Sequence, residues 1–544
     1  METPGLSKPD RLSSRRLAIF KPPVACSTPH AITSVSYGCS TCPQVETELL
    51  ESPGAHQGLT VLLYYLIYLL DNYWTFCVLP MHDQMDIIIQ LPSGTISAAQ
   101  KENLVHARGV PYAHAKRFEP PQSIAPWEGV VDYTRPSTIC PQAPSRLDMV
   151  TGPLAKGRAM DEDCTHLSIA APIGGQNLPV MVFFHGGAYL TGGGDLDCYQ
   201  GLELAARGVV VVSVTYRLGI FGYLQIPGIA PANLGLLDQI EALNWVKNNI
   251  LSFGGDPSNV TLFGESAGAD SIFCLMAAEG TEGLFHRAIL QSAPIGRRYD
   301  KSAESLTLAL SKVAEEKLQS LAAGSPSIEE MLSIQLQLLI TAKKLGSRGM
   351  PFAPSFGQHP LPQISELDDV IRKRAKDIPV LISCTKDEGT PFAAMNDRAA
   401  RFFTIPLLGR CIRWLVSWLI TKKVFHSPSK HFQKQVLAAG GKCSSFYFRW
   451  APPSSPWGAA HTIDLPFLLG SWSSWEDAPM LGGSKSRDVV ERVGSHVKDV
   501  WVAFSKGVDL GSNTLIIDES FRSEHCIKEE KFKLTSGILS GKTP

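Results

Sequence analysis

Val260-Thr261-Leu262-Phe263-Gly264-Glu265-Ser266-Ala267-Gly268 is the stretch of this 544-residue chain that decides its fold. Its first four residues form an apolar run that favours a β-strand, and the residues from Ala267 to Glu279 favour a helix. Gly-x-Ser-x-Gly between a strand and a helix is typical of a nucleophile elbow, a turn so tight that glycines must flank the serine. The stretch therefore predicts a nucleophilic serine at position 266 and indicates a serine hydrolase.

Short β-branched or aromatic runs alternate with helix-like segments around this elbow. The alternation predicts a largely parallel sheet with crossover helices, which is an α/β fold. In such a sheet, functional groups gather at the carboxyl ends of the strands. The expected strands are Pro179–Phe184, Val209–Tyr216, Val260–Phe263, Ala288–Gln291, Pro379–Cys384 and Ser445–Trp450.

The first of these strands is followed by His185-Gly186-Gly187-Ala188, a loop whose glycines leave backbone N–H groups free to point at a ligand. A tetrahedral oxyanion needs two or three such donors, each of which lowers the barrier by roughly 2.7–4 kcal/mol. We expect the N–H groups of Gly186, Gly187 and Ala267 to form this oxyanion hole. A simple β-turn is the alternative for a lone His-Gly-Gly, and the downstream elbow argues against it.

A serine hydroxyl is a weak nucleophile, so Ser266 needs a base within hydrogen-bond reach and an acid that orients the base. In α/β hydrolases the order along the chain is serine, then Asp or Glu, then histidine. Asp387 and Glu388 follow one expected strand, and His461 follows the next. This order predicts that His461 is the base, but the spacing does not choose between the two carboxylates.

The overall composition excludes some classes of partner. With 50 basic and 51 acidic residues, the chain offers no large net charge for binding nucleic acid or an acidic polymer. We expect one catalytic domain over residues 85–544, behind an extension of residues 1–84 that shows no helical or strand period. This extension is expected to be disordered or to result from a mis-assigned translation start. No metal and no organic cofactor are expected.

The extension contains an apolar stretch at residues 59–80, which Asp71 and Asn72 interrupt. It falls short of the ~20 clean apolar residues of a membrane helix. A signal anchor is one interpretation, but we favour a translation start at Met81 or Met85, because the residues that follow read as an opening strand.

The expected location is intracellular, with membrane anchoring through residues 59–80 as the alternative. A single N-glycosylation sequon begins at Asn259, and it leads directly into the elbow strand, where a glycan would not fit.

Several further motifs resemble those of the type B carboxylesterase family, which includes the cholinesterases and the bacterial para-nitrobenzyl esterases. The resemblance runs from about Met85 to the C-terminus and implies an α/β-hydrolase fold with helical lid insertions that cleaves small-molecule carboxylic esters. Its motifs are Gly109-Val110-Pro111-Tyr112-Ala113, Glu162-Asp163-Cys164, Tyr216-Arg217-Leu218-Gly219, Asn233–Gln239, Phe253-Gly254-Gly255-Asp256-Pro257 and the elbow itself.

The resemblance also implies roles for individual residues. The acid of the family's Asp-Glu-Gly turn falls on Glu388, and the base of its Gly-x-x-His falls on His461. Supporting positions around the histidine fall on Glu265, Ser292 and Asp464.

The resemblance implies two structural pairs as well. A disulfide would join Cys140 to Cys164 and close a loop that rims the gorge, if the compartment is oxidising. An ion pair would join Glu162 to Arg117.

The lid is expected at Tyr299–Met350 and Met395–Lys423. The second segment carries an apolar stripe from Phe402 to Leu419, which we expect to pack in the core. If part of it lines the gorge instead, the substrate is expected to be an apolar acyl or aryl ester. Two alternatives stay open: a lipase acting on long-chain esters, and an adhesion or carrier protein that keeps the fold without catalysis.

Overall fold

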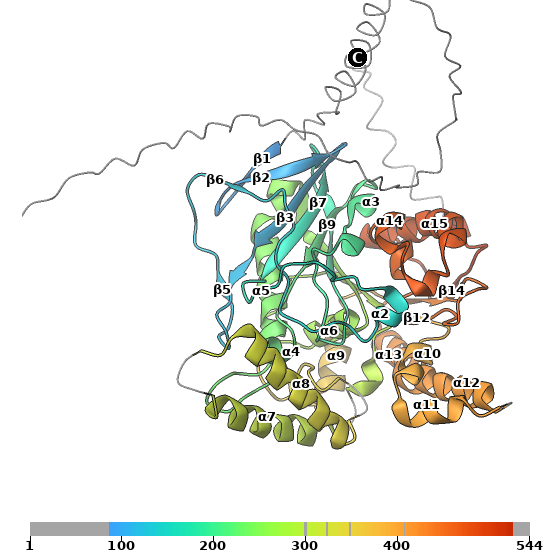
Figure 1. Cartoon of the computed structure of the whole chain (residues 1–544). Helices are drawn as coiled ribbons and strands as arrows, with labels where there is room; N and C mark the ends of the chain where they lie inside the picture. Colours follow the sequence, from blue (N-terminus) through green and yellow to red (C-terminus); the bar gives the residue numbers. More distant parts are fainter. Residues whose placement is uncertain (1–85, 299–301, 322–324, 348–349, 407, 526–544) are drawn as a thin grey trace, which may run out of the picture. The chain divides into compact units, whose positions relative to one another are not determined.

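The computed structural model describes residues 86–298, 302–321, 325–347, 350–406 and 408–525 (Figure 1). They fall within one compact unit, Asp83–Pro544. The extension, its apolar stretch at residues 59–80 and the two candidate start sites lie outside the described residues, so these expectations stay predictions. Within the described ranges, every helix is too short or too polar to span a bilayer.

A 12-stranded sheet forms the centre of this unit. Its strands are β1 (Asp86–Leu91), β2 (Gly94–Lys101), β3 (Leu104–Pro111), β6 (Val130–Asp132), β7 (His166–Pro172), β8 (Leu178–Phe184), β9 (Val210–Val214), β10 (Gly255–Glu265), β11 (Arg287–Gln291), β12 (Val380–Thr385), β13 (Cys443–Phe448) and β14 (Thr514–Ile517). The short strands β4 (Ala113–His114) and β5 (Gln122–Ser123) form a separate pair.

The spatial order of the strands is β1-β2-β3-β7-β9-β8-β10-β11-β12-β13-β14, and β6 pairs with β2. Neighbours from β1 to β9 along this path are antiparallel. Those from β9 to β14 are parallel. The predicted parallel sheet is therefore confirmed for the half that carries the elbow. All six expected strands are found, five with shifts of one or two residues at their ends, and the elbow strand begins five residues earlier than expected.

The central parallel strands β8 and β9 are almost entirely apolar because both of their faces are covered. On β8, Val180, Val182 and Phe184 join one buried core. The alternating residues Met181 and Phe183 join a second core on the opposite face. This period of two explains why β8 reads as a continuous hydrophobic run.

Helices supply the two covering layers and the insertions. Their bounds are α2 (Asp148–Thr151), α3 (Leu202–Ala205), α4 (Gly219–Gly222), α5 (Leu234–Asn249), α6 (Ala267–Leu275), α7 (Ala303–Gln319), α8 (Ile328–Lys344), α9 (Leu367–Arg374), α10 (Gly389–Ala394), α11 (Asp397–Phe403), α12 (Gly409–Ile420), α13 (Ser427–Ala438), α14 (Trp472–Trp475) and α15 (Arg487–Ser505). Helices α5 and α6 pack on the first core and α15 on the second.

The two expected lid segments form helices beside the sheet. Helices α7 and α8 pack on each other, and α11 packs on α12 (Figure 1). The N-terminus of α8 is fixed by a capping box, in which Ser327 Oγ accepts from the N–H of Glu330 while the Glu330 carboxylate accepts from the N–H of Ser327.

The apolar stripe of the second lid segment does not pack in the core, contrary to our expectation. Leu407 lies outside the described residues, and Phe403 and Ile412 are half-buried. The other large side chains of the stripe are exposed: Phe402, Leu408, Trp414, Leu415, Trp418 and Leu419. Helix α12 is amphipathic, but its apolar face points to solvent because the small residues Gly409 and Ser417 face the protein instead.

Candidate active site

Ser266 occupies the sharp turn between β10 and α6. Its backbone has φ 55 and ψ −120, a strained conformation for a residue with a side chain. The turn is held by a hydrogen bond from the N–H of Ser266 to the carbonyl of Gln291 (2.9 Å). A Cβ on Gly268 would lie only 1.9 Å from the carbonyl oxygen of Phe184, so helix α6 can approach β8 only with glycine at this position.

A continuous chain of hydrogen bonds joins the three predicted triad residues. Ser266 Oγ lies 2.8 Å from His461 Nε2, and His461 Nδ1 lies 2.5 Å from Glu388 Oε2. The second carboxylate oxygen of Glu388 accepts from the N–H of Thr385 (2.7 Å), which fixes the orientation of the carboxylate. Glu388 and His461 are fully buried and Ser266 is nearly so.

Asp387, the neighbouring carboxylate, does not contact the histidine. Its N–H donates to the carbonyl of Ala459 (2.8 Å), and its Oδ2 accepts from the N–H of the same residue (2.9 Å). Together with a β-bridge to Ala460, these bonds join the loop after β12 to the loop after β13. In the structure, Glu388 is therefore the carboxylate that contacts His461, and Asp387 is the carboxylate that holds the two loops together.

Two more predicted residues surround the histidine. Glu265 Oε1 lies 3.2 Å from His461 Nε2. Burial raises the pKa of Glu265 to about 8 and the pKa of Asp464 to about 6. Burial alone would lower the pKa of His461, but the charges of Glu265 and Glu388 outweigh it and raise this pKa to about 9. Glu265 and His461 therefore compete for protons.

Ser292 is buried at the end of β11, next to the elbow, and has φ 52. Among the described residues, its hydroxyl has no hydrogen-bond partner, so it forms no hydrogen bond with His461. Its neighbour Gln291, which the sequence did not single out, donates to Asp464 Oδ2 (2.8 Å) and also accepts from the backbone of Ser266. Gln291 could have been identified from the sequence because it is a glutamine at the end of an otherwise apolar expected strand.

The predicted oxyanion loop begins where β8 ends. A Cβ on Gly186 would lie 3.1 Å from the Cβ of Ser266, so this loop lies directly beside the nucleophile. Gly187 has φ 111, and the carbonyl oxygen of Thr191 would lie 2.0 Å from its Cβ, so no other residue fits. Ala267 is the first residue of α6, where an N–H has no partner inside the helix. The three predicted donors thus lie on two segments that flank Ser266.

A buried network that the sequence analysis missed supports this loop. Ala188 and Tyr189 both have positive φ, which costs of order 1–3 kcal/mol each. The hydroxyl of Tyr189 donates to Asp270 Oδ2 (2.6 Å), and Arg298 Nε donates to Asp270 Oδ1 (2.7 Å). The Arg298 guanidinium also donates to the Tyr189 hydroxyl and to the carbonyl of Pro354. The network joins the loop to α6 and to Arg298 and Pro354, which flank the first lid segment on either side.

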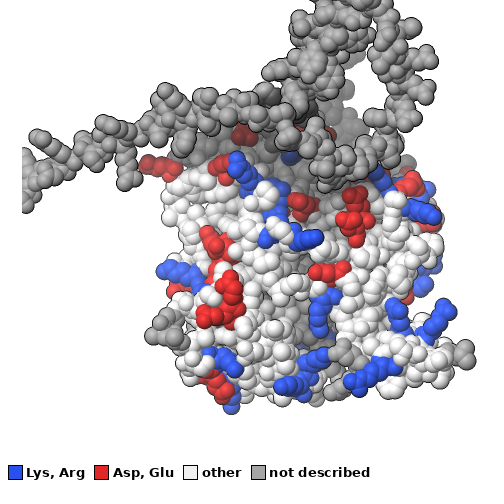
Figure 2. All heavy atoms as spheres, viewed as in Figure 1, with Lys and Arg blue, Asp and Glu red and all other residues white. Residues whose placement is uncertain are grey.

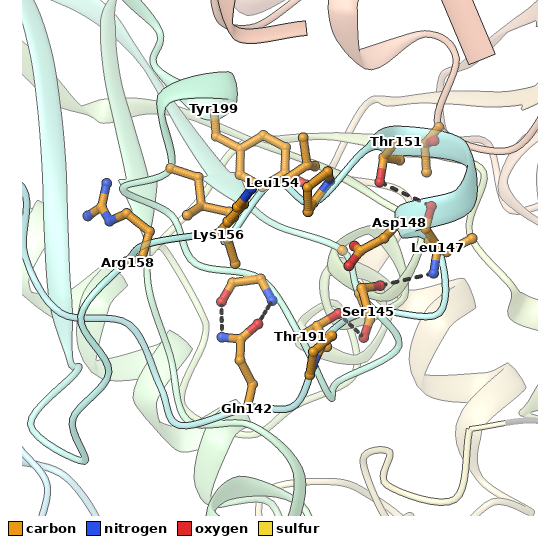
Figure 3. Close-up of a pocket in the computed structure, with 18 of the residues that line it drawn as sticks. Gln142, Ser145, Leu147, Asp148, Thr151, Leu154, Lys156, Arg158, Thr191 and Tyr199 are labelled. Carbon is orange, nitrogen blue, oxygen red and sulfur yellow. Dashed lines mark hydrogen bonds between the residues drawn. The ribbon is translucent and has the colours of Figure 1, made fainter. Parts of the chain in front are cut away.

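A cavity of about 290 Å³ borders the site on the side of Gly186, Gly187 and Glu265 (Figure 3). Most of its wall comes from the segment between Cys140 and Cys164. Gln142, which lines the cavity, holds the segment that follows the predicted oxyanion loop. Its side chain donates to the carbonyl of Gly192 and accepts from the N–H of Gly192. The remaining lining includes Pro144, Leu147, Thr151, Pro153, Leu154, Ala155, Lys156, Arg158, Met160, Leu196, Tyr199 and Leu465.

Cys140 and Cys164 are neighbours, but the predicted disulfide is not formed in this structure. Both side chains are free thiols and fully buried. A hydrogen bond that the Cys164 thiol donates to Cys140, together with burial, raises the pKa of Cys164 well above its usual value. The segment between the two cysteines nevertheless rims the cavity, as expected, and Arg117 forms the expected ion pair with Glu162 (2.8 Å from Nε to Oε2).

On the largely parallel sheet, a strained serine lies between a strand and a helix, and a histidine from a later loop contacts it. This arrangement defines the α/β-hydrolase class. The chain belongs to the carboxylesterase family, whose model matches residues 86–405. It is therefore a carboxylic ester hydrolase, and the predicted fold and family are confirmed.

Known relatives agree with this assignment. The chain is 36% identical over 425 residues to a probable N-octanoylanthranilate hydrolase of Rhodococcus erythropolis (76% of this chain, 92% of the relative). It is 34% identical over 437 residues to the para-nitrobenzyl esterase of Bacillus subtilis (74% and 87%). Among solved structures, a thermophilic para-nitrobenzyl esterase matches with a TM-score of 0.67 and 29% identity, covering 79% of this chain and 96% of that one.

Proposed function

We propose that Ser266, His461 and Glu388 are the catalytic triad through which this enzyme cleaves small carboxylic esters. The observation that carries the proposal is the buried hydrogen-bonded chain from Ser266 Oγ through the imidazole to Glu388, with bonds of 2.8 and 2.5 Å. The 2.8 Å between Ser266 Oγ and His461 Nε2 is within the range over which a base can abstract the serine proton.

The reaction proceeds in two halves. Ser266 Oγ attacks the ester carbonyl while its proton passes to His461 Nε2, and the C–O bond then breaks as the same proton passes to the leaving alcohol. Water, deprotonated by His461, attacks the acyl-enzyme and releases the acid. The N–H groups of Gly186, Gly187 and Ala267 stabilise the oxyanion in both halves. Glu388 holds the Nδ1 proton and stabilises the imidazolium. No step in this scheme requires a metal or an organic cofactor.

The proposed substrate is an ester with an apolar or aromatic group that fits the cavity beside Gly187. The lining that supports this proposal includes four leucines and two prolines, together with Met160 and Tyr199. The name of the Bacillus relative specifies a para-nitrobenzyl ester, which is consistent with it. The name of the Rhodococcus relative specifies an amide, N-octanoylanthranilate, which shares with the proposed substrate an apolar chain and an aromatic ring but not the ester bond. The alternative of a lipase on long-chain esters stays an untested prediction.

A fluorophosphonate probe tests the nucleophile directly. We expect stoichiometric labelling of the native protein, and peptide mapping should place the label on Ser266, because only an activated serine attacks the probe's phosphorus. Prior denaturation should abolish labelling. A label on another serine would refute the assignment, and no label on the native enzyme would refute serine catalysis.

The pH dependence tests the role of Glu265. Hydrolysis requires neutral His461, so activity should rise as pH increases through the pKa of this histidine. Glu265→Gln removes the largest charge that raises this pKa. The neutral imidazole should then form at lower pH. The acidic limb of the kcat/KM profile should therefore shift to lower pH by roughly one pH unit. Glu304→Gln, on the exposed start of α7, is the matched control and should leave the limb in place. An unchanged limb in Glu265→Gln would show that Glu265 does not act on His461.

A further inference from the structure

The exposed apolar side of α11 and α12 is the most unusual surface in the described part of the chain. We call it the α12 face and define it by its exposed large side chains: Phe402, Ile405, Leu408, Trp414, Leu415, Trp418 and Leu419. Trp414 is 65% exposed, Leu408 59% and Phe402 54%. Scattered apolar residues on a surface need no explanation, but a contiguous group of this kind marks a binding surface.

The residues of this face follow the helical repeat. Arg410, Trp414, Trp418 and Lys422 lie four residues apart and therefore form one row along the helix surface. Leu415 and Leu419 lie in the adjacent row. The rings of Trp414 and Trp418 stack with their centroids 6.3 Å apart, and the Lys422 ammonium lies 4.9 Å from the Trp418 ring. The face is thus a band of indole and leucine side chains with a cation at each end.

The charge along α12 and the end of α11 has one sign, whereas Asp397 begins α11. The sequence from Arg401 to Lys423 contains five cationic residues and no Asp or Glu. Figure 2 shows Lys and Arg, and no Asp or Glu, over the region of α11 and α12 at the lower right. Indole rings and leucine side chains between cations are the composition of a helix that lies in the interface of a bilayer, where Trp occupies the headgroup level and Lys and Arg contact anionic lipids.

We propose that the α12 face docks this enzyme onto an anionic membrane surface. A second copy of the chain is a poorer occupant, because a two-fold pair of α12 helices would bring Arg410 of one copy close to Lys422 of the other, with no acidic residue in the segment to compensate. An anionic lipid surface provides apolar acyl chains for the apolar band and negative headgroups for both cations.

Docking at this face would place the membrane beside the active site. Helix α12 packs on the turn that carries Glu388, since a Cβ on Gly389 would lie 2.1 Å from the carbonyl oxygen of Ser417. The N–H of Gly389 donates to Thr421 Oγ1 (2.8 Å), directly after α12. Phe425, in the next turn, lies 5.1 Å from the His461 ring.

Vesicle co-sedimentation tests the proposal with the full chain in the Ser266→Ala background, so that no lipid is hydrolysed. We expect binding to vesicles of phosphatidylcholine with phosphatidylserine, weaker binding to phosphatidylcholine alone, and weakening by added salt. The double variant Trp414→Ala/Trp418→Ala should lower the affinity by at least about tenfold. Arg410→Glu/Lys422→Glu should lower it by a similar factor on the anionic vesicles only.

The matched control is Leu336→Ala/Ile340→Ala, which removes two exposed apolar side chains (58% and 48% exposed) from α8 at the same spacing. It should bind like the parent protein. Three outcomes would overturn the proposal: no binding to anionic vesicles, equal binding by the Trp414→Ala/Trp418→Ala variant, or a self-association that this variant abolishes in the absence of vesicles. The assay measures binding alone, so its outcome is independent of the proposed triad.

Discussion

Replacing Ser266 with Ala is expected to lower kcat for para-nitrophenyl acetate or butyrate by on the order of 10⁶-fold. The alanine removes the only atom that forms the bond to the acyl group, while His461 and Glu388 keep their contact. Steady-state hydrolysis, measured at enzyme concentrations high enough to detect the residual rate, provides the value.

The fold of this variant should be unchanged. Ser266 holds the turn with its backbone N–H, not with its side chain, and a Cβ is still present to fill the site. The thermal unfolding midpoint should therefore stay within a few degrees of the native value. Retention of more than a small fraction of the activity, with the turn intact, would show that another group is the nucleophile.

Replacing Glu388 with Gln is expected to lower kcat by about 10⁴-fold. The amide keeps the size of the carboxylate, but it loses the charge that stabilises the imidazolium. It can also present an N–H to His461 Nδ1, which would favour the wrong tautomer. The measurement is kcat for the same soluble esters across the pH range.

Asp387→Asn is the matched control because it makes the same chemical change one residue earlier. Burial already raises the pKa of Asp387 above its usual value. An asparagine oxygen can still accept from the N–H of Ala459, so this variant should keep most of its activity. Equal losses in the two variants would mean that the carboxylates share one structural role and that Glu388 is not the acid.

Much of the active site could be predicted from the sequence because its chemistry lies in local motifs. The elbow requires glycine on both sides of Ser266, and the oxyanion loop requires glycine at position 187, so each leaves a short pattern. His461 followed from its order after the expected strands. Spacing could not separate Asp387 from Glu388, because adjacent residues in a turn differ only in where their side chains point. The family resemblance favoured Glu388, and the structure brings this residue to the histidine.

The supporting contacts could not be predicted because they join distant parts of the chain. Tyr189 and Asp270 are 81 residues apart, and Asp270 and Arg298 are 28 apart. Each is an ordinary polar residue in its own segment, and only the fold makes them partners.

The apolar stripe of α12 shows a different limit. A helical period reveals that a helix has two unlike faces, but it does not reveal which face meets the protein. Gly389 and Ser417 decide this, since their close approach requires the small side chains of α12 to face inward. The apolar residues are therefore left on the outside.

The ladder between Asp387 and Ala459 has a consequence for motion. It joins the loops that carry Glu388 and His461, which also follow neighbouring strands, so backbone hydrogen bonds link these loops in addition to the contact between the two side chains. Ser266 belongs to a different strand and helix. A displacement of the linked loops relative to the turn at Ser266 would therefore change the distance between His461 Nε2 and Ser266 Oγ and leave the contact between Glu388 and His461 intact.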